Sequence, residues 1–444
     1  MRRFLSRVLP LLLSFGLIFS CTGCSTVLVL AGKARENSEA SSSVISESSA
    51  SSGVISTPVP TEDGDLRAFY TDVANAESVT VMVYMIGSDL ESEDGSATDD
   101  LLEMADAALS ENIHLVLQTG GTETWWNDVC TDDESERFVI ENGDMTLLQS
   151  LGSMNMTDAD TLSDFIRFSA ESYPADRYEL ILWDHGGGTM TGFGYDELYE
   201  DTSLTLSSLS TALYNGGVQF DFIGFDACLM ATAEVAYALE PYADYLIASE
   251  ESEPGEGWAY KNWLTMLAEN PAVPTAELGK KLADDFLEAY IFADMPTLSV
   301  LDLRYVPELY AALESYWGSA YTALQSGSYG AFSQVRNNVR EFGDNEYDQV
   351  DLSDLATLTK QSLSLGTEDD VQAAVQNMVV YNVTYEKSAA GIAVYFPCLW
   401  PDYYGDTRFE MTCVGFPESY FEFYDKFMNT MLSGQSLSQS DIDF

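Results

Sequence analysis

The chain has 444 residues, of which 46% are hydrophobic, and its 72 acidic against 19 basic residues give a formal net charge of −53. This apolar content is enough for a large core, so the acidity does not indicate a disordered polyanion. A surface this negative excludes nucleic acid as a partner, because nucleic-acid binding needs Lys and Arg to displace counterions. Cationic partners are attracted instead.

The first 24 residues are typical of an export signal. Arg2, Arg3 and Arg7 precede an apolar run that ends at Cys21-Thr-Gly-Cys24. The small pair before the second cysteine resembles a bacterial lipobox, which would place a lipid on Cys24, although Cys21 stands where Leu is usual. An uncleaved anchor of about 20 apolar residues and free secretion are the alternatives. All three place the protein outside the cytoplasm, with membrane contact only through the N-terminal anchor.

The rest of the chain divides by composition. Residues 25–75 are expected to form a Ser-rich flexible tether. A folded domain is expected over residues 76–305, a helix-rich C-terminal portion over 306–434, and a disordered tail over 435–444.

Strand and helix patterns alternate through the 76–305 domain. Short β-branched apolar runs lie at residues 79–86, 113–118, 178–183, 220–225 and 245–248. Helical spacing of apolar residues occurs at 99–109, 158–171, 204–214 and 229–239. Residues 138–151 form a hairpin pattern around Asn142-Gly143. The alternation predicts an α/β fold, with a mainly parallel sheet flanked by helices.

Beyond Pro254 the pattern changes to longer helical segments, at residues 275–289, 306–325 and 369–381. Strand-like runs at 298–303 and 391–396 interrupt them. We expect these two strands to extend the same sheet.

The cysteines of the folded part are Cys130, Cys228, Cys398 and Cys413, and the only histidines are His114 and His185. Cysteines this sparse indicate a fold held by its core. A three-histidine zinc site is excluded. His114 lies inside a predicted strand, so we expect a structural role for it.

Two reactive residues stand where parallel strands end, the place where open sheets bind ligands. His185 follows one predicted strand and is followed by Gly186, Gly187 and Gly188, whose bare N–H groups suit an oxyanion hole. Cys228 follows the next strand and is expected to open a helix that lowers its thiol pKa. Taken singly, the cysteine also fits a small buried side chain and the glycines a turn. Together they supply a thiolate, a proton donor and oxyanion donors.

The segments Leu182–Gly188 and Gly224–Met230 resemble the clostripain family of cysteine endopeptidases, which belongs to the caspase and gingipain clan. Weaker matches occur at Asp89-Leu90-Glu91, Glu234, Ser249-Glu250 and Val350-Asp351-Leu352. The resemblance implies a caspase-like catalytic domain over residues 76–305. It also implies Cys228 as nucleophile and His185 as proton donor to the leaving amine. The N–H groups of Gly186 and Cys228 would hold the oxyanion.

Asp226 is the candidate substrate-binding residue. Members of the family favour Arg or Lys before the cleaved bond, and the residue two before the cysteine is associated with this preference. Side chains two apart on a strand point the same way, so Asp226 can offer its carboxylate to a basic side chain beside Cys228. A buried Asp that caps a helix at Cys228 is the alternative.

The sequence does not determine whether the chain is cut during maturation or whether it needs a cofactor. Some family members cut themselves at a basic residue between the two blocks, but residues 186–227 contain no Lys or Arg. We expect activity as a single chain, or a cut elsewhere. Calcium dependence also occurs in the family, so Ca²⁺ is the one cofactor considered, although the acidic stretch 344–354 does not match an EF-hand.

The sequence thus predicts an exported, lipid-anchored, monomeric cysteine endopeptidase that hydrolyses proteins or peptides after Arg or Lys through a Cys/His dyad. Two other classes stay open. One is a non-catalytic surface protein that binds cationic peptides. The other is a cysteine transpeptidase, which would pass the acyl group to an amine.

Overall fold

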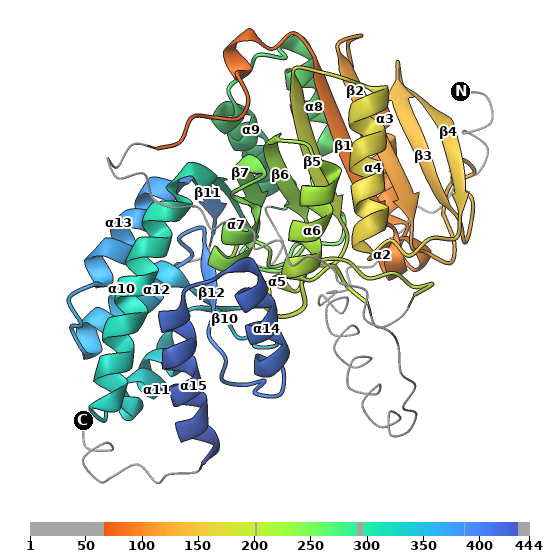
Figure 1. Ribbon diagram of the computed structural model, residues 1–444. Helices are drawn as coiled ribbons and strands as arrows, with labels where there is room; N and C mark the ends of the chain where they lie inside the picture. The colour runs from red at the N-terminus through yellow and green to blue at the C-terminus, as the bar shows by residue number, and fades with distance from the viewer. Residues whose placement is uncertain (1–65, 200–201, 291–295, 386, 434–444) are drawn as a thin grey trace, which may run out of the picture.

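The structure is a computed structural model and describes residues 66–199, 202–290, 296–385 and 387–433 (Figure 1). The predicted export signal, Cys24, the tether up to residue 65 and the tail at 435–444 lie outside these residues. Within the described ranges, no helix combines the length and the apolarity needed to cross a membrane.

A nine-stranded sheet forms the centre of the molecule, in the order β11-β8-β7-β6-β5-β1-β2-β3-β4. Its parallel strands are β1 (Val79–Ile86), β2 (Ile113–Gly120), β5 (Arg177–Trp183), β6 (Phe220–Asp226) and β7 (Ala243–Ala248). These strands are buried almost throughout, as their continuous apolar runs predict. The α/β fold with a mainly parallel sheet is thereby confirmed.

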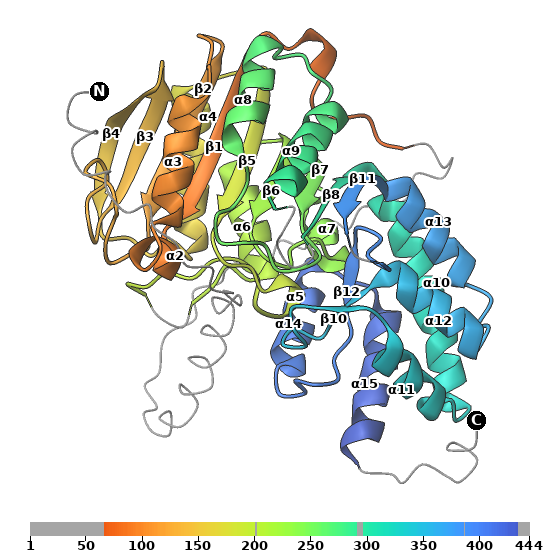
Figure 2. The ribbon, with the colours of Figure 1, turned by 180° about the vertical axis from the view of Figure 1, so that it is seen from behind.

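Helices cover both faces of the sheet, and each face has its own hydrophobic core. One face carries α4 (Ala159–Ser172), α6 (Leu206–Gly216) and α7 (Ala233–Leu239), which lie in front in Figure 1. The other carries α3 (Ser96–Asp106), α8 (Tyr260–Glu269) and α9 (Thr275–Ala289), in front in Figure 2. Three short helices complete this part: η3 (Val73–Asn75), α2 (Ser88–Ser92) and α5 (Gly188–Thr191).

Antiparallel strands close both edges of the sheet. The predicted hairpin is β3 (Ser135–Glu141) and β4 (Asp144–Gly152), and both of its turn residues, Asn142 and Gly143, have positive φ. At the other edge lie β8 (Thr297–Asp302) and β11 (Val379–Thr384). The helix predicted over 369–381 is wrong at its end. Helix α13 (Glu368–Met378) stops at Met378, because the next residues form strand β11, which pairs with β8.

The C-terminal portion is rich in helices, as predicted. They are η4 (Leu303–Tyr305), α10 (Val306–Gln325), α11 (Tyr329–Asn338), α12 (Leu352–Ser362), α13, α14 (Tyr404–Val414) and α15 (Glu418–Leu432). A second, three-stranded sheet joins β9 (Glu341–Phe342), β10 (Gln349–Asp351) and β12 (Ala393–Tyr395). The strand predicted at 391–396 therefore does not extend the main sheet, since its partner is β10.

The two expected domains share one core. Trp317 of α10 packs against Tyr420 and Tyr424 of α15, and this aromatic group is continuous with the core beneath α6 and α7. β11, from the C-terminal portion, is an edge strand of the main sheet. The C-terminal portion is thus built onto the sheet that carries the site.

Residues 66–75 belong to the predicted tether, but they lie against the folded domain. Arg67 pairs with Glu240 at 2.8 Å and with Asp244 at 2.6 Å. Phe69 stacks on Tyr245 with ring centroids 5.6 Å apart. Because Arg67 and Phe69 contact the domain in this way, the folded domain begins before residue 76, the start predicted from composition.

Candidate active site

The predicted reactive residues meet at the carboxyl edge of the sheet. His185 follows β5, and Cys228 follows the neighbouring strand β6, where Trp183 pairs with Asp226. A Cβ atom added to Gly186 would overlap the carbonyl oxygen of Cys228. The glycine loop after His185 and the chain around Cys228 are therefore in direct contact.

The segment from Ala227 to Thr232 is here called the nucleophile turn, after its predicted nucleophile Cys228, and it is not helical. The predicted helix at 229–239 is wrong at its start, because α7 begins at Ala233 with Thr232 as its N-cap. Leu229 has φ of +69°, which a helix does not allow. Its N–H donates to the carbonyl of Glu251 at 3.2 Å. Cys228 therefore has no helix dipole to lower its thiol pKa.

A backbone contact takes the place of the expected dipole. The Glu253 N–H donates to Sγ of Cys228 at 3.2 Å, and the thiol lies 3.7 Å from the Glu253 carbonyl oxygen. Cys228 is 7% exposed. A donor aimed at sulfur favours the thiolate, the form that attacks a carbonyl.

His185 is held by Asp89, the first residue of this site that the sequence did not single out. Nε2 of His185 lies 2.6 Å from Oδ1 of Asp89, which belongs to α2 directly after β1. Burial opposes the charge on His185, yet the Asp89 hydrogen bond and the charges of Asp184, Asp89 and Cys228 raise its pKa to about 9. Asp89 was visible only as part of a weak family match. Its place at the end of a neighbouring parallel strand could have pointed to it.

Asp226 does not lie open in a cleft. It is 4% exposed and accepts hydrogen bonds from Trp258 N–H at 3.0 Å and Tyr260 Oη–H at 2.7 Å. The alternative of a cap on a Cys228 helix fails, because no helix begins there.

Asp226 belongs to a buried group of carboxyls that we call the acid cluster: Asp100, Asp226 and Glu253. A Cβ atom on Gly257 would stand 2.6 Å from an Asp100 carboxylate oxygen and 3.0 Å from one of Asp226, so the Gly257 backbone covers both. Glu253 accepts from Trp258 Nε1 at 3.1 Å. Sequence reasoning missed Asp100 and Glu253, which lie far from Cys228 along the chain.

Burial makes ionisation of the acid cluster costly. It raises the pKa of Asp226 to about 7 and the pKa values of Asp100 and Glu253 well above their usual range. Among the described residues, none of the three forms an ion pair with Lys or Arg. The cluster is a buried acidic region beside Cys228 that lacks a positive charge.

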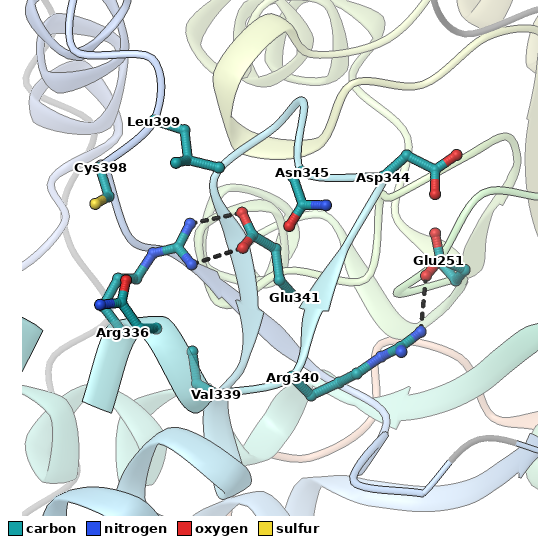
Figure 3. A pocket seen from close by; sticks show the side chains of 10 residues that line it. Glu251, Arg336, Val339, Arg340, Glu341, Asp344, Asn345, Cys398 and Leu399 are labelled. Carbon is teal, nitrogen blue, oxygen red and sulfur yellow. Dashed lines mark hydrogen bonds and ion pairs between the residues drawn. The ribbon is translucent and has the colours of Figure 1, made fainter. Parts of the chain in front are cut away.

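A polar hollow of about 490 Å³ lies next to the nucleophile turn, lined in part by Glu251 (Figure 3). Figure 3 shows Arg336 facing Glu341, at 2.7 and 2.6 Å, and Arg340 reaching Glu251 at 3.0 Å. These ion pairs neutralise the charges of both arginines, and Asp344 adds a further carboxylate to the lining. Because Glu251 also accepts from Leu229, the hollow is a junction between the C-terminal portion and the nucleophile turn.

Metal binding finds no support in the described ranges, where no group of three or more His, Cys, Asp or Glu side chains is arranged to hold an ion. Ca²⁺ dependence stays an untested expectation. All four cysteines of the described part are free thiols.

Comparison with known proteins identifies the family. Residues 83–438 match the family model described as the clostripain family, peptidase C11. The chain belongs to this family of cysteine peptidases. Clostripain of Hathewaya histolytica is 29% identical over 217 residues, an alignment that covers 41% of each chain. The chain thus spans well under half the length of that relative.

Solved structures support the fold. An inactive zymogen of a C11 protease from Parabacteroides distasonis superposes with a TM-score of 0.58 at 21% identity, over 78% of this chain and 98% of that one. A secreted C11 cysteine protease from Bacteroides thetaiotaomicron, in complex with an irreversible peptide inhibitor, gives 0.57 at 18% identity, over 76% and 99%. The fold is that of C11 proteases.

The contact between the glycine loop and the nucleophile turn makes a first prediction. We expect Gly186→Ala to lower kcat/KM by about 100-fold or more, because the added methyl group would push apart the glycine loop and the nucleophile turn, the two segments predicted to hold the oxyanion. Gly318→Ala, where nothing lies within 4 Å of the added carbon, is the matched control. The test is the steady-state kcat/KM of both variants, with melting curves to show that they fold. Full activity of a folded Gly186→Ala enzyme would contradict a role of the glycine loop in holding the oxyanion.

Proposed function

We propose that the protein is an exported, lipid-anchored endopeptidase that cuts after Arg or Lys through Cys228 and His185. The observation that carries this proposal is the position of the acid cluster, next to Cys228 and without a cation of its own among the described residues. The leader ending at Cys24 supports export and anchoring, and the C11 protease from Bacteroides thetaiotaomicron is described as secreted.

The chemistry follows from the residues at the edge of the sheet. The Cys228 thiolate attacks the carbonyl carbon of the substrate, and the N–H groups of Gly186 and Cys228 hold the resulting oxyanion. His185 gives a proton to the amine as the C–N bond breaks, which leaves an acyl-enzyme. Water then attacks the thioester, transfers a proton to His185, and releases the new carboxylate and the thiolate.

The acid cluster accounts for a basic residue before the cleaved bond. An ammonium or guanidinium group bound beside the Gly257 backbone that covers Asp100 and Asp226 would bring the positive charge that the three crowded carboxyls lack, and it would favour their ionised form. The net charge of −53 also raises the local concentration of cationic peptides. A Leu side chain would leave the cluster unpaired.

The direct experiment compares fluorogenic peptides that differ only in Arg, Lys, Asp or Leu before the cleaved bond. We expect thiol-dependent turnover of the Arg or Lys peptide alone. Equal turnover of the Leu peptide would contradict the basic preference. Loss of peptide to aminolysis products when an amine is added, without hydrolysis, would favour a transpeptidase.

Asp226 should make substrate binding depend on pH. Its raised pKa of about 7 means that the carboxyl is neutral below that pH and ionised above it. We expect KM for the Arg peptide to fall as pH rises from 6 to 8, roughly in step with this ionisation. In Asp226→Asn, KM at pH 8 should rise about tenfold, the worth of one charged hydrogen bond.

The matched control is Asp106→Asn, an exposed carboxyl on α3 that pairs with Lys261. It should leave both KM and its pH dependence unchanged. A KM that tracks pH equally in wild type and Asp226→Asn would show that another group controls binding.

A further inference from the structure

We propose that Asp89 is the third member of the catalytic set, a positioning residue that grips Nε2 of His185 and so turns Nδ1 toward Cys228 and the leaving amine. This inference rests on the proposed function. Its basis is the 2.6 Å contact, made by a histidine side chain that is 8% exposed and a carboxylate that is 20% exposed. A buried ring with one nitrogen held by a carboxylate has one orientation and one nitrogen left for chemistry.

The chain holds Asp89 in place through a strained neighbour. Ser88 is fully buried with φ of +49°, a conformation that non-glycine residues seldom adopt. Its N–H donates to Gly121 at 3.1 Å, and its hydroxyl donates to Asp184 at 2.7 Å. Ser88 thus ties the residue before Asp89 to Gly121, after β2, and to Asp184, after β5.

These contacts form a closed ring. Asp184 precedes His185 directly and anchors Ser88, while Asp89 follows Ser88 directly and binds His185. The ends of β1 and β5 are thus joined twice, once through each carboxyl. A ring of this kind fixes the imidazole relative to the sheet.

The charged groups that face His185 come from three elements. Asp89 lies on α2, Asp184 at the end of β5 and Cys228 on the nucleophile turn, and the Tyr195 ring meets the imidazole edge-on at 6.3 Å. Burial raises the pKa of Asp184 to about 7. For Asp89, burial is outweighed by the hydrogen bond from His185, and its pKa is lowered. Asp89 is therefore the carboxylate that stays ionised over the working pH range.

The role follows from where the proton sits. Asp89 accepts the Nε2–H throughout, and the proton that passes to the amine leaves from Nδ1. The carboxylate stabilises the imidazolium and takes no proton itself. Asp89→Asn keeps the size and an oxygen acceptor but removes the charge, so it should lower the pKa of His185 without emptying the site.

The chain offers a clean measurement, because it has only two histidines. In a His114→Gln background, the single remaining imidazole signal in an NMR titration reports His185. We expect its pKa to fall by at least one unit in Asp89→Asn. The alkaline limb of kcat/KM should move down by the same amount, and kcat should fall about tenfold or more with KM within twofold.

Two control variants distinguish a positioning role of Asp89 from a general effect on folding. Asp94→Asn changes an exposed acid close by and should leave the titration unchanged. Asp89→Glu keeps the charge and should retain a raised pKa, which keeps the test valid if the Asn variant does not fold. An unchanged His185 pKa in folded Asp89→Asn, or an ordinary one in folded Asp89→Glu, would overturn the proposal.

The titration also distinguishes this inference from the proposed function. A pKa of His185 that depends on Asp89, in a protein that cleaves no peptide, would refute the peptidase proposal and leave the positioning of His185 intact. Peptide turnover with a His185 pKa independent of Asp89 would do the reverse.

Discussion

Replacing Cys228 by Ala is expected to reduce kcat/KM for an Arg peptide by about 10³-fold or more while the fold persists. The variant loses the proposed nucleophile, and binding with oxyanion stabilisation alone leaves little residual catalysis. The fold should persist because the change removes one small sulfur atom, and the nucleophile turn keeps its backbone bonds to Ser249 and Glu251.

The matched control is Cys130→Ala, which removes another buried thiol. Burial raises the pKa of Cys130 to about 12, so it is inert as a nucleophile. This variant should keep full activity. Peptide turnover by a folded Cys228→Ala enzyme at more than a tenth of the wild-type rate would assign the chemistry to another residue.

The second large effect is on stability, which should fall as pH rises. Burial raises the pKa to about 8 for Glu179 and to about 7 for Asp184, Asp226 and Glu234. The unfolded chain releases these protons near pH 4, whereas the folded state keeps them up to about pH 7 to 8, which defines a window from about pH 4 to 8. This contribution to stability is complete below that window and is lost as pH rises through it.

The measurement is the melting temperature at pH 5 and at pH 8. We expect a lower value at pH 8, and repulsion within a chain of net charge −53 acts in the same direction. An equal or higher melting temperature at pH 8 would show that these carboxyls are ionised without cost.

Glu234→Gln isolates one member of the set. Glu234 accepts hydrogen bonds from Tyr395 N–H at 3.0 Å and from the Thr189 hydroxyl at 3.1 Å, and no ion pair of it occurs among the described residues. Gln keeps one oxygen acceptor for the Tyr395 N–H, its NH₂ group can donate to the Thr189 hydroxyl oxygen instead, and it cannot ionise. The variant should gain stability relative to wild type at pH 8 and show little change at pH 5.

The sequence predicts most of the sheet because its strands are buried on both faces. Runs such as Val79–Ile86 are apolar at every position except Thr80 and end at glycine or a polar residue, which marks both the strand and its carboxyl end. The meeting of His185 and Cys228 follows, since neighbouring parallel strands deliver their ends to one edge.

What the sequence does not predict depends on contacts between distant segments. Residues 229–232 have helical composition, but the bonds of the nucleophile turn to Ser249 and Glu251 hold Leu229 at a positive φ. The acid cluster draws Asp100 from α3 and Glu253 from the loop after β7, a grouping with no local pattern. Asp89 depends likewise on Ser88 and Asp184.

In the C-terminal portion, too, the long helix is predicted from the sequence and the short strands are not. The long helix over 306–325 is predicted to the residue, because its apolar face has helical spacing. The strands β9 and β10 are two and three residues long, too short for a periodicity to show. The sequence of β11 continues the helical pattern of α13, and only its pairing with β8 makes it a strand.

The most direct test of the central claim is covalent labelling by an irreversible peptide inhibitor that carries Lys or Arg before its reactive group. Intact mass and peptide mapping of the labelled protein should show one adduct, on Cys228, formed faster than with the Leu analogue and absent in Cys228→Ala. An adduct on Cys398 or Cys413, or equal rates for the Lys and Leu inhibitors, would contradict a basic-specific site built around Cys228.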